Sequence, residues 1–334
     1  MNNAFPFAAI VGQEDMKLAM IMTAIDPKIG GVLVFGDRGT GKSTAVRGLA
    51  DLLPPIKSVE GCPVNSGSLE ETPSWYKASS TKLIEIPMPV VDLPLGIGSD
   101  RVTGALDIEK ALVEGIKSFQ PGLLAKANRG YLYIDEVNLL EDHIVDLLLD
   151  VSQSGENVIE REGLSIRHAS DFILIGSGNP EEGELRPQLL DRFGLSVEVV
   201  TPTSIQERIE VIKRRDLYDQ DPQSFQQNWK KENQKICKKI LDARKIIDKI
   251  ETPESILELC AEICIELGSD GLRGELTLLR AARALAAYRN SKKILKTHIK
   301  NVASMCLSHR LRRDPLDETG TSSRVERALN TVCG

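Results

Sequence analysis

The sequence predicts an α/β protein in which a parallel sheet with helices on both faces is followed by a helical domain. Short, continuous apolar runs, which are typical of strands buried in a parallel sheet, occur at 31–35, 131–134 and 172–175. Segments with helical periodicity separate these runs, and almost everything beyond residue 200 has the period of a helix. The length of 334 residues agrees with two domains, because a single core rarely grows beyond about 250–300 residues. We therefore place the sheet domain at 1–200 and the helical domain at 201–334.

The patterns between the strands at 31–35 and 131–134 predict a helix, a short strand within a proline-rich stretch, and a second helix. A helical pattern at 44–52 follows the first strand directly. Residues 82–95 mix β-branched residues with three prolines, so only the portion 89–93 fits a central sheet and the rest is loop or insertion. Apolar residues return at helical spacing over 107–117.

The second half of the sheet domain predicts a helix, a hairpin and two more strands. The strand at 131–134 precedes a strongly amphipathic helical pattern at 137–151. Residues 155–171 alternate on both sides of Glu162 and Gly163, which is the pattern of a β-hairpin. The strand at 172–175 and a further strand at 195–200 complete the predicted sheet.

Charge and hydropathy exclude disorder and a membrane span. The hydrophobic fraction of 41% is near the globular average, and no apolar run approaches the roughly 18 residues that a membrane span needs. The net charge of −6 is uneven: residues 1–210 carry 18 basic and 31 acidic side chains, and 211–334 carry 24 and 17. In the basic half the lysines and arginines alternate with acidic and apolar residues at helical spacing, so a solvated helix face explains them better than nucleic-acid binding.

The segment between the first strand and the first helix matches the phosphate-binding pattern G-x-x-x-x-G-K-[ST]. Its eight residues are Gly36, Asp37, Arg38, Gly39, Thr40, Gly41, Lys42 and Ser43. The glycines let backbone N–H groups turn toward phosphate oxygens, and the helix N-terminus adds partial positive charge. We expect Lys42 to reach the β- and γ-phosphates and Ser43 to bind Mg²⁺. The sequence therefore predicts a nucleotide site.

Two carboxylates, Asp135 and Glu136, directly follow the strand at 131–134. We expect Asp135 to anchor Mg²⁺ and Glu136 to act as the base for the attacking water, or to orient that water. An isolated Asp-Glu pair is usually solvent-facing, but its place after four apolar residues and downstream of the phosphate loop favours catalysis. A kinase excludes water and needs no such glutamate, so the pair favours hydrolysis.

Three further residues suit a hydrolytic site. Asn179 follows the strand at 172–175, where its amide would help to position the lytic water. Arg192 stands between apolar neighbours and suits an arginine finger, which is worth about 10³–10⁵ in rate, although a surface ion pair would also explain it. Arg273 opens a helix and would sense the γ-phosphate from the second domain, unless it is an ordinary arginine at a helix start.

Together these motifs resemble those of the AAA+ ATPases and, more narrowly, those of the magnesium chelatase I subunit family. The narrower resemblance rests on Val11–Glu14, Gly122–Gly130, Asp135–Leu140 and Gly271–Leu285, and it runs essentially end to end. It includes the hairpin before the strand at 172–175 and the insertion around 82–124. The implied fold is an AAA+ P-loop NTPase core with β-hairpin insertions plus a C-terminal helical lid domain.

The resemblance also implies a function and partners. The chain is expected to be the ATP-hydrolysing motor subunit of a magnesium chelatase, with ATP and Mg²⁺ as cofactors. It would form a ring, commonly hexameric, in which Arg192 acts on the neighbour's nucleotide. The ring would dock on a D subunit and drive an H subunit, which inserts Mg²⁺ into protoporphyrin IX in chlorophyll synthesis. The family implies cyanobacterial cytoplasm or plastid stroma, and the first residues show no secretion signal.

Two other functions remain open at this point. A MoxR-like chaperone ATPase would share the core and the insertions, although the long match over Gly122–Leu140 argues against it. A nucleic-acid motor could use the hairpin at 156–169, but this segment carries three acidic residues and no aromatic residue for stacking. We therefore expect no nucleic-acid partner.

Histidines and cysteines give no second metal site. The four histidines are scattered, and no Cys-x-x-Cys pair occurs. Cys260 and Cys264 share one face of a probable helix, where buried apolar packing explains them better than metal binding. The expected metal is the Mg²⁺ of the nucleotide.

Overall fold

The computed structural model describes residues 4–37, 39–77, 80–107, 112–113, 118–161, 164–179, 185, 187–269, 271–311 and 320–333. The chain divides into two compact units. The first unit comprises 1–4 and 42–183, and the second comprises 5–41 and 184–334. The domain boundary at residue 200 stays a prediction.

The first unit contains three parallel strands with β7 in the middle. Strand β7 (Tyr131–Ile134) pairs in parallel with β4 (Val90–Leu93) on one side and with β10 (Ile173–Gly178) on the other. All residues of β7 and β10 are buried, as the continuous apolar runs predicted. Helix α2 (Lys42–Leu52) contacts β4 and β7 and places Val46 and Leu49 in the core. The carboxyl ends of these strands carry Asp135 and Asn179.

Three antiparallel pairs form the insertions of the first unit. They are β2 (Ile56–Val59) with β3 (Leu83–Ile86), β5 (Gly104–Leu106) with β6 (Phe119–Pro121), and the predicted hairpin of β8 (Glu156–Arg161) with β9 (Leu164–Ala169). Among the described residues, this unit also contains the helices α3 (Ser99–Thr103), α5 (Leu123–Ala127) and α6 (Asp142–Ser154) and the 3₁₀ turn η3 (Val137–Leu139).

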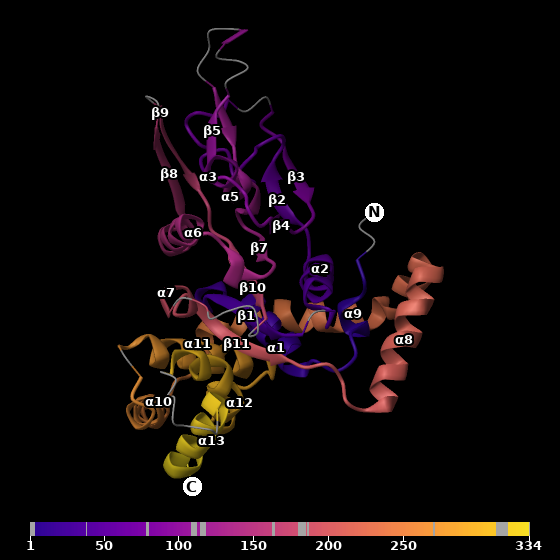
Figure 1. The fold of residues 1–334 in the computed structure, drawn as a ribbon, viewed down its shortest axis with the longest axis vertical. Coiled ribbons are helices and arrows are strands. Elements are labelled where there is room, and N and C mark those ends of the chain that lie inside the picture. The colour runs from indigo at the N-terminus through magenta and orange to yellow at the C-terminus, as the bar shows by residue number, and fades with distance from the viewer. Residues whose placement is uncertain are drawn as a thin grey trace. The chain divides into compact units, whose positions relative to one another are not determined.

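An apolar cluster attaches the hairpin to the β5–β6 insertion. Phe119 of β6, Ile159 of β8 and Ile166 of β9 are buried together, and Trp75 packs against them. The Trp75 and Phe119 rings meet edge to face at 4.8 Å, a favourable aromatic geometry, and Trp75 Nε1 donates to Arg167 O at 3.2 Å. Strand β5 and the hairpin belong to the same unit, and both are labelled in Figure 1.

The helix predicted at 137–151 is wrong at its start. Glu136 has a left-handed backbone (φ 54°), and the 3₁₀ turn that follows it ends in extended residues before α6 begins at Asp142. Apolar periodicity cannot reveal that interruption, because the turn contains apolar residues. Most of the other helix, predicted at 107–117, lies outside the described residues.

Asn128 and Arg129 join the β2 loop region to the central strands of the first unit. Asn128, 2% exposed, donates from Nδ2 to Val64 O at 2.7 Å and accepts at Oδ1 from Asp171 N at 2.9 Å. Arg129 has φ 63° and donates from Nη1 to the carbonyl oxygens of Lys57 and Asn65. These contacts give the two polar residues a structural role, which the sequence pattern of this segment did not reveal.

Replacing Asn128 by alanine is expected to lower the free energy of unfolding by about 2–4 kcal/mol, because the buried Val64 O and the partly buried Asp171 N lose their partner. The exposed-face change Lys57→Ala serves as control, since only the Lys57 backbone oxygen bonds to Arg129. Urea unfolding followed by circular dichroism measures both. A stability of Asn128→Ala equal to that of the control would contradict this role.

The second unit contains the other two strands of the predicted parallel sheet. Strand β1 (Gly31–Gly36) pairs in parallel with β11 (Phe193–Val199). Helix α1 (Glu14–Ile25) contacts both strands and is buried along most of its length, including Ala19 and Met20. The strands predicted from the sequence at 31–35 and 195–200 are confirmed.

The described elements beyond residue 200 are helices and 3₁₀ turns, as predicted. Helices α10 to α13 pack on one another, α11 also contacts α9 and α1, and Figure 1 shows α10 to α13 in orange to yellow. Besides α1, the second unit contains η1 (Phe7–Ala9), η2 (Pro27–Ile29), α7 (Pro187–Leu190), α8 (Ile205–Gln220), α9 (Pro222–Ile246), η5 (Ile247–Lys249), α10 (Glu254–Glu266), α11 (Arg273–Tyr288), α12 (Lys296–Leu307), η6 (Ser308–Arg310) and α13 (Gly320–Cys333).

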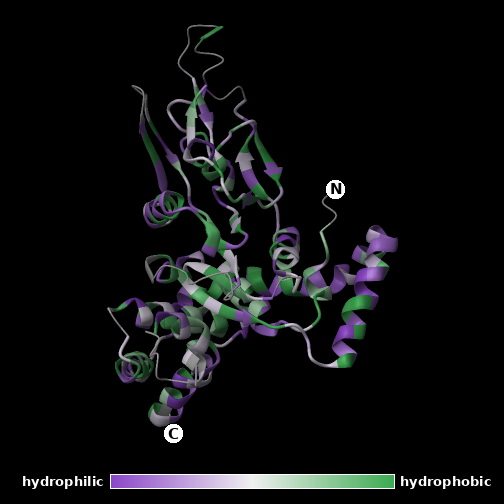
Figure 2. Cartoon of the chain, in the orientation of Figure 1, coloured by the Kyte–Doolittle hydropathy of each residue, from purple (hydrophilic) through white to green (hydrophobic). Residues whose placement is uncertain are grey.

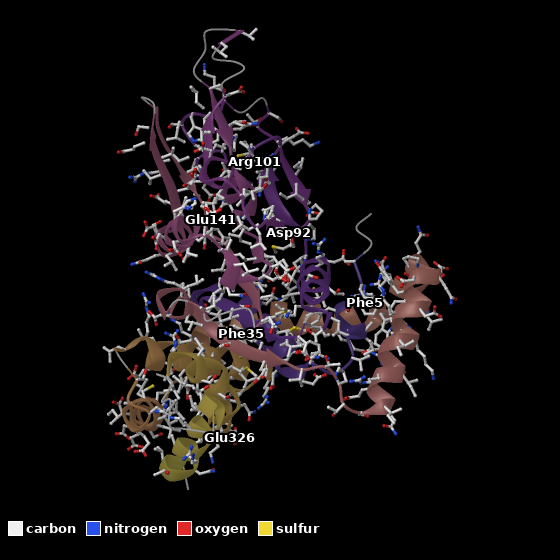
Figure 3. All side chains as sticks on the ribbon, in the orientation of Figure 1. Phe5, Phe35, Asp92, Arg101, Glu141 and Glu326 are labelled. Carbon is white, nitrogen blue, oxygen red and sulfur yellow. The ribbon has the colours of Figure 1, made fainter. Side chains whose placement is uncertain are left out.

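An aromatic cluster joins α8, α9 and the start of the second unit. Phe5, labelled in Figure 3, contacts the rings of Tyr218 and Phe225 at 5.1 and 5.3 Å. Trp229 packs against the cluster and carries the Arg214 guanidinium over its ring at 4.6 Å. Purple and green residues alternate along α8 in Figure 2, in keeping with its contact to α9 on one side.

Candidate functional site

The phosphate loop combines three glycines that need their special backbone. Gly36 has φ 140°, and a Cβ there would lie 1.8 Å from Val199 O of the paired strand, so no other residue fits. Gly39 and Gly41 have φ 77° and 84°, and a Cβ added at either would meet nothing within 4 Å, so the backbone angle and not crowding requires glycine. The loop matches the predicted strand, turn and helix context.

One hydroxyl within the loop and one from Thr201 hold the shape of the loop. Thr40 Oγ1 donates to Asp37 O at 2.8 Å, and Thr201 Oγ1 donates to Asp37 Oδ2 at 3.0 Å. Lys42 and Ser43 are the first two residues of the eleven-residue α2 and are half-buried. Arg38 lies outside the described residues.

Asp135 and Glu136 follow β7 as predicted, and two hydroxyl groups surround the Asp135 carboxylate. Tyr133 Oη donates to Asp135 Oδ1 at 2.9 Å, and Ser177 Oγ donates to the same oxygen at 2.5 Å. Ser177 Oγ also accepts from Glu136 N at 3.2 Å. Asp135 itself is exposed, so its carboxylate is held from the protein side and open to solution on the other.

Burial explains the titration behaviour of Tyr133. Desolvation raises the pKa of its phenol well above the usual range, and the negative charge of Asp135 raises it further. Tyr133 therefore keeps its proton and stays a donor at every physiological pH. Asp92 of β4, labelled in Figure 3, lies beside Tyr133 in the strand register and pairs with Arg47 of α2 at 2.9 Å.

Asn179 is the residue directly after β10 and is half-buried. Since β10 runs parallel to β7, the carboxyl ends of both strands lie at one edge of the sheet in the first unit. The structure thus brings Asn179 to the same edge as Asp135 and Glu136.

Arg192 lies in a turn that a buried arginine supports. Its backbone N donates to Leu189 O at 3.0 Å, and its side chain is half-buried. The next residue, Phe193, accepts through its carbonyl oxygen from Arg310 Nη2 at 3.1 Å and bonds to His309 Nε2 at 3.0 Å. Arg310, only 7% exposed, also bonds to the Asp191 carboxylate, so the segment after α12 holds the turn that carries Arg192.

Arg273 begins α11, and its guanidinium pairs with the carboxylate of Asp191. Asp191 therefore bridges Arg273 and Arg310 within the second unit. The predicted sensing role of Arg273 stays a prediction, and in the structure its described partner is this carboxylate.

His309 gives the second unit a pH-dependent stability. Desolvation by burial, with the nearby charge of Arg310 as a smaller cause, lowers the pKa of its imidazole to about 3. Its Nε2 bonds to Phe193 O, and Nδ1 has no hydrogen-bond partner among the described residues. The folded chain therefore keeps His309 neutral where the unfolded chain protonates it.

Because the folded pKa lies below the unfolded value, the stability that His309 contributes is present above pH 6.5 and is lost as the pH falls toward 3. Between pH 7.5 and 5 the wild type should lose about 2 kcal/mol more than His309→Gln, which keeps a donor but does not titrate. Urea unfolding at both pH values measures the difference. Equal losses in the two proteins would contradict this account.

The candidate residues divide between the two units. Lys42, Ser43, Asp135, Glu136 and Asn179 belong to the first, and Gly36, Asp37, Gly39, Thr40, Gly41, Arg192 and Arg273 belong to the second. Sequence reasoning missed Tyr133 and Ser177. A signal was present, because Tyr133 and Asp135 are two residues apart on a strand and share a face, and Ser177 precedes Asn179 by two.

The residues present fit a nucleotide with Mg²⁺. Mg²⁺ takes oxygen ligands and typically combines one or two protein ligands with phosphate oxygens, which suits the Ser43 hydroxyl and the Asp135 carboxylate. Among the described residues no group of three or more His, Cys, Asp or Glu could hold a metal ion. Cys260 and Cys264 are buried in α10, as predicted, and burial raises the pKa of each thiol to about 12.

No helix within the described ranges is long and apolar enough to cross a membrane.

Two family models match the chain. Residues 106–188 match the family described as magnesium chelatase, subunit ChlI, and residues 257–329 match the AAA lid domain. The second match falls on helices α10 to α13, in the part of the chain that the sequence predicts to be a helical lid domain.

The chain is similar over its whole length to curated proteins. It is 67% identical over 332 residues to the magnesium-chelatase 38 kDa subunit of Cereibacter sphaeroides, covering 99% of both chains. It is 50% identical to the magnesium-chelatase subunit ChlI of a Nostoc species, covering 99% of this chain and 90% of that protein, and 50% identical to the ChlI subunit of Euglena gracilis, covering 98% and 96%.

Solved structures agree on the fold. One of them is a model of the complex between subunits BchI and BchD of magnesium chelatase, based on cryo-electron microscopy. Its matching chain is 63% identical to this chain with a TM-score of 0.58, and the match covers 98% of this chain and 100% of that chain. A putative ATPase from Cytophaga hutchinsonii is 18% identical with a TM-score of 0.67, covering 97% and 90%, which shows a shared fold.

Proposed function

The chain belongs to the family of the magnesium-chelatase ChlI subunits, which has an AAA+ fold, and from this premise we propose that it is the ATP-hydrolysing motor subunit of a magnesium chelatase. The observation that carries the proposal is the 67% identity over nearly the entire chain, together with a complete set of hydrolytic motifs. The same relatives support the chelatase and not the alternative of a MoxR-like chaperone. The cofactors of the proposed reaction are ATP and Mg²⁺.

The phosphate loop provides the binding part of the proposed mechanism. Backbone N–H groups of Gly39, Thr40 and Gly41 would surround the phosphates, and the N-terminus of α2 adds positive potential. Lys42 would place its ammonium group against the β- and γ-phosphates, while Ser43 and Asp135 would hold Mg²⁺. When bound, the metal offsets phosphate charge.

Water activation would fall to Glu136 and Asn179. A carboxylate one residue beyond Asp135 can accept a proton from a water at the γ-phosphate, and the Asn179 amide at the same sheet edge can orient that water. Positive charge for the transition state would come from Arg192, and Arg273 would detect the γ-phosphate.

We further propose a homo-oligomeric ring, with a hexamer as the first candidate, that binds the D and H subunits. A relative of 63% identity appears in a complex of BchI with BchD, which supports a D-type partner. In such a ring Arg192 would act on the nucleotide of the adjacent subunit. The compartment, cyanobacterial cytoplasm or plastid stroma, and the absence of a nucleic-acid partner stay predictions.

Complementation of a bacterium that lacks its own 38 kDa subunit tests the proposed function in cells. Cereibacter sphaeroides without its own 38 kDa subunit should regain magnesium-containing porphyrins, detected by fluorescence of extracts, when it expresses this chain. The Glu136→Gln variant, expressed at the same level, should restore none. If wild-type expression also restored none while the native subunit did, the assignment as a chelatase subunit would be contradicted.

A further inference from the structure

Strand register places two hydroxyl side chains beside the Asp135 carboxylate. Tyr133 pairs with Ile175 and Ile134 pairs with Gly176 in the β7–β10 ladder, so the next residues along, Asp135 and Ser177, are neighbours. Tyr133 and Asp135 are two residues apart and therefore share one face of the sheet. The tyrosine and the serine thus reach the carboxylate from two adjacent strands.

Both hydroxyls bind the same oxygen of Asp135. Tyr133 Oη donates to Oδ1 at 2.9 Å and Ser177 Oγ donates to it at 2.5 Å. The Tyr133 and Ser177 oxygens are themselves 3.2 Å apart, so the two donors converge on one point. Hydrogen bonds to a charged acceptor are about twice as strong as neutral ones, so this arrangement fixes the rotation of the carboxylate.

Both donors are held by their burial. Ser177 is 1% exposed and Tyr133 is 5% exposed, while Asp135 is exposed. Among the described residues, the hydrogen bonds of Asp135 go to these two hydroxyls and use Oδ1, which leaves Oδ2 for other ligands. Buried donors behind an exposed carboxylate are the arrangement by which proteins orient a metal ligand.

Ser177 has a second task that Tyr133 does not share. Its Oγ accepts from the backbone N of Glu136 at 3.2 Å, where the Glu136 backbone is left-handed with φ 54° and ψ 56°. A left-handed glutamate is strained and needs outside support. The serine therefore stabilises the left-handed backbone of Glu136, which sets the direction of the Glu136 side chain relative to that of Asp135.

We propose that Tyr133 and Ser177 are positioning residues for magnesium-nucleotide binding, Tyr133 by orienting the Asp135 carboxylate and Ser177 by orienting that carboxylate and the Glu136 backbone. This inference rests on the proposed ATP hydrolysis and adds two residues to it. Neither residue touches the reacting atoms. Each acts through a carboxylate that does.

The two roles give different signatures for two conservative variants. Tyr133→Phe removes one donor to Asp135 and leaves the Glu136 turn intact. It should therefore raise the Mg²⁺ concentration at which analogue binding and the ATPase rate are half-maximal about tenfold. Its kcat at saturating Mg²⁺ should stay within about twofold of wild type. Ser177→Ala should raise the Mg²⁺ requirement by a similar factor and also lower kcat about tenfold or more. Tyr131→Phe is the matched control, a buried tyrosine on the same strand outside the Asp135 contacts.

The experiment uses the full chain and two readouts. Binding of a fluorescent ADP analogue is titrated with Mg²⁺ and repeated in EDTA, and ATPase rates are measured over the same Mg²⁺ range. In EDTA all four proteins should bind the analogue within about twofold of one another, because the phosphate loop is untouched. With Mg²⁺, the two test variants should shift the binding curve and Tyr131→Phe should not.

Three results from the variants would overturn the proposal. One is a Mg²⁺ titration of Tyr133→Phe that superimposes on wild type. Another is a fall in kcat for Ser177→Ala with no change in its Mg²⁺ requirement. The third is weaker binding in EDTA for both variants, which would indicate general damage to the fold. A wild-type chain that binds the analogue without any effect of Mg²⁺ would overturn the proposed function itself, and this inference with it.

Discussion

The variant Lys42→Ala should lose ATP binding. Lys42 is the first residue of α2 and ends a loop whose positive-φ glycines suit a phosphate cradle. Removing a cation that faces phosphate oxygens costs about 3–5 kcal/mol, which is a loss of affinity of more than about 100-fold. Equilibrium binding of a fluorescent ATP analogue measures the loss, and hydrolysis should fall below detection with it.

A matched lysine separates this effect from a change in total charge. Lys57 of β2 is exposed and lies in the first unit like Lys42, and Lys57→Ala removes the same charge. The control should bind the analogue with wild-type affinity. Retained ATP binding in Lys42→Ala, or an equal loss in Lys57→Ala, would contradict the assignment of the phosphate loop.

The second large effect is expected for Arg192→Ala, which should bind ATP within about threefold of wild type but hydrolyse it about 10³-fold more slowly or worse. Its turn is held by Arg310 through Asp191 and Phe193, contacts that do not involve the Arg192 side chain. The fold should therefore survive. Arg215→Ala on α8 removes an exposed arginine paired with Asp219 and should leave turnover unchanged.

Mixing subunits tests whether Arg192 acts between neighbours. Arg192→Ala supplies an intact Glu136, and Glu136→Gln supplies an intact Arg192, so mixed rings should contain some complete sites. Partial ATPase activity is expected at intermediate ratios of two otherwise inactive proteins. No recovery at any ratio would indicate a self-contained site or obligatory coupling around the whole ring, and full turnover of Arg192→Ala alone would exclude the finger role.

The sequence predicted the parts of the fold that depend on local pattern. Strand β7 and the first three residues of β10, Ile173–Ile175, are buried and continuously apolar, so they are easy to recognise. The hairpin β8–β9 was visible because its two strands alternate around a short connection. The helical second half likewise followed from its period.

The same local patterns could not predict which strands pair over a long distance in the sequence. Strand β2 pairs with β3 across an insertion, and β3 lies in the proline-rich stretch assigned to loop or insertion. The late start of α6 depends on the left-handed backbone of Glu136, which a glutamate does not signal. Such features depend on tertiary contacts and not on local propensity.

The candidate site divides in the same way. Motif residues such as Lys42 and Asp135 could be assigned from spacing, because the chemistry of phosphate and Mg²⁺ demands those residue types in that order. The supporting residues could not. Arg310 reaches Asp191 across 119 residues and Ser177 reaches Asp135 across 42, and only the folded chain brings them together.

Reconstituted magnesium insertion tests the central claim most directly. Purified D and H subunits of a relative, protoporphyrin IX, Mg²⁺ and ATP are combined with this chain, and the fluorescence of magnesium protoporphyrin is followed over time. Insertion that requires the wild-type chain and is absent with Lys42→Ala is the predicted result. ATP hydrolysis by the wild-type chain with no insertion, under conditions where the relative's own subunit supports it, would contradict the claim and leave an AAA+ ATPase with another client.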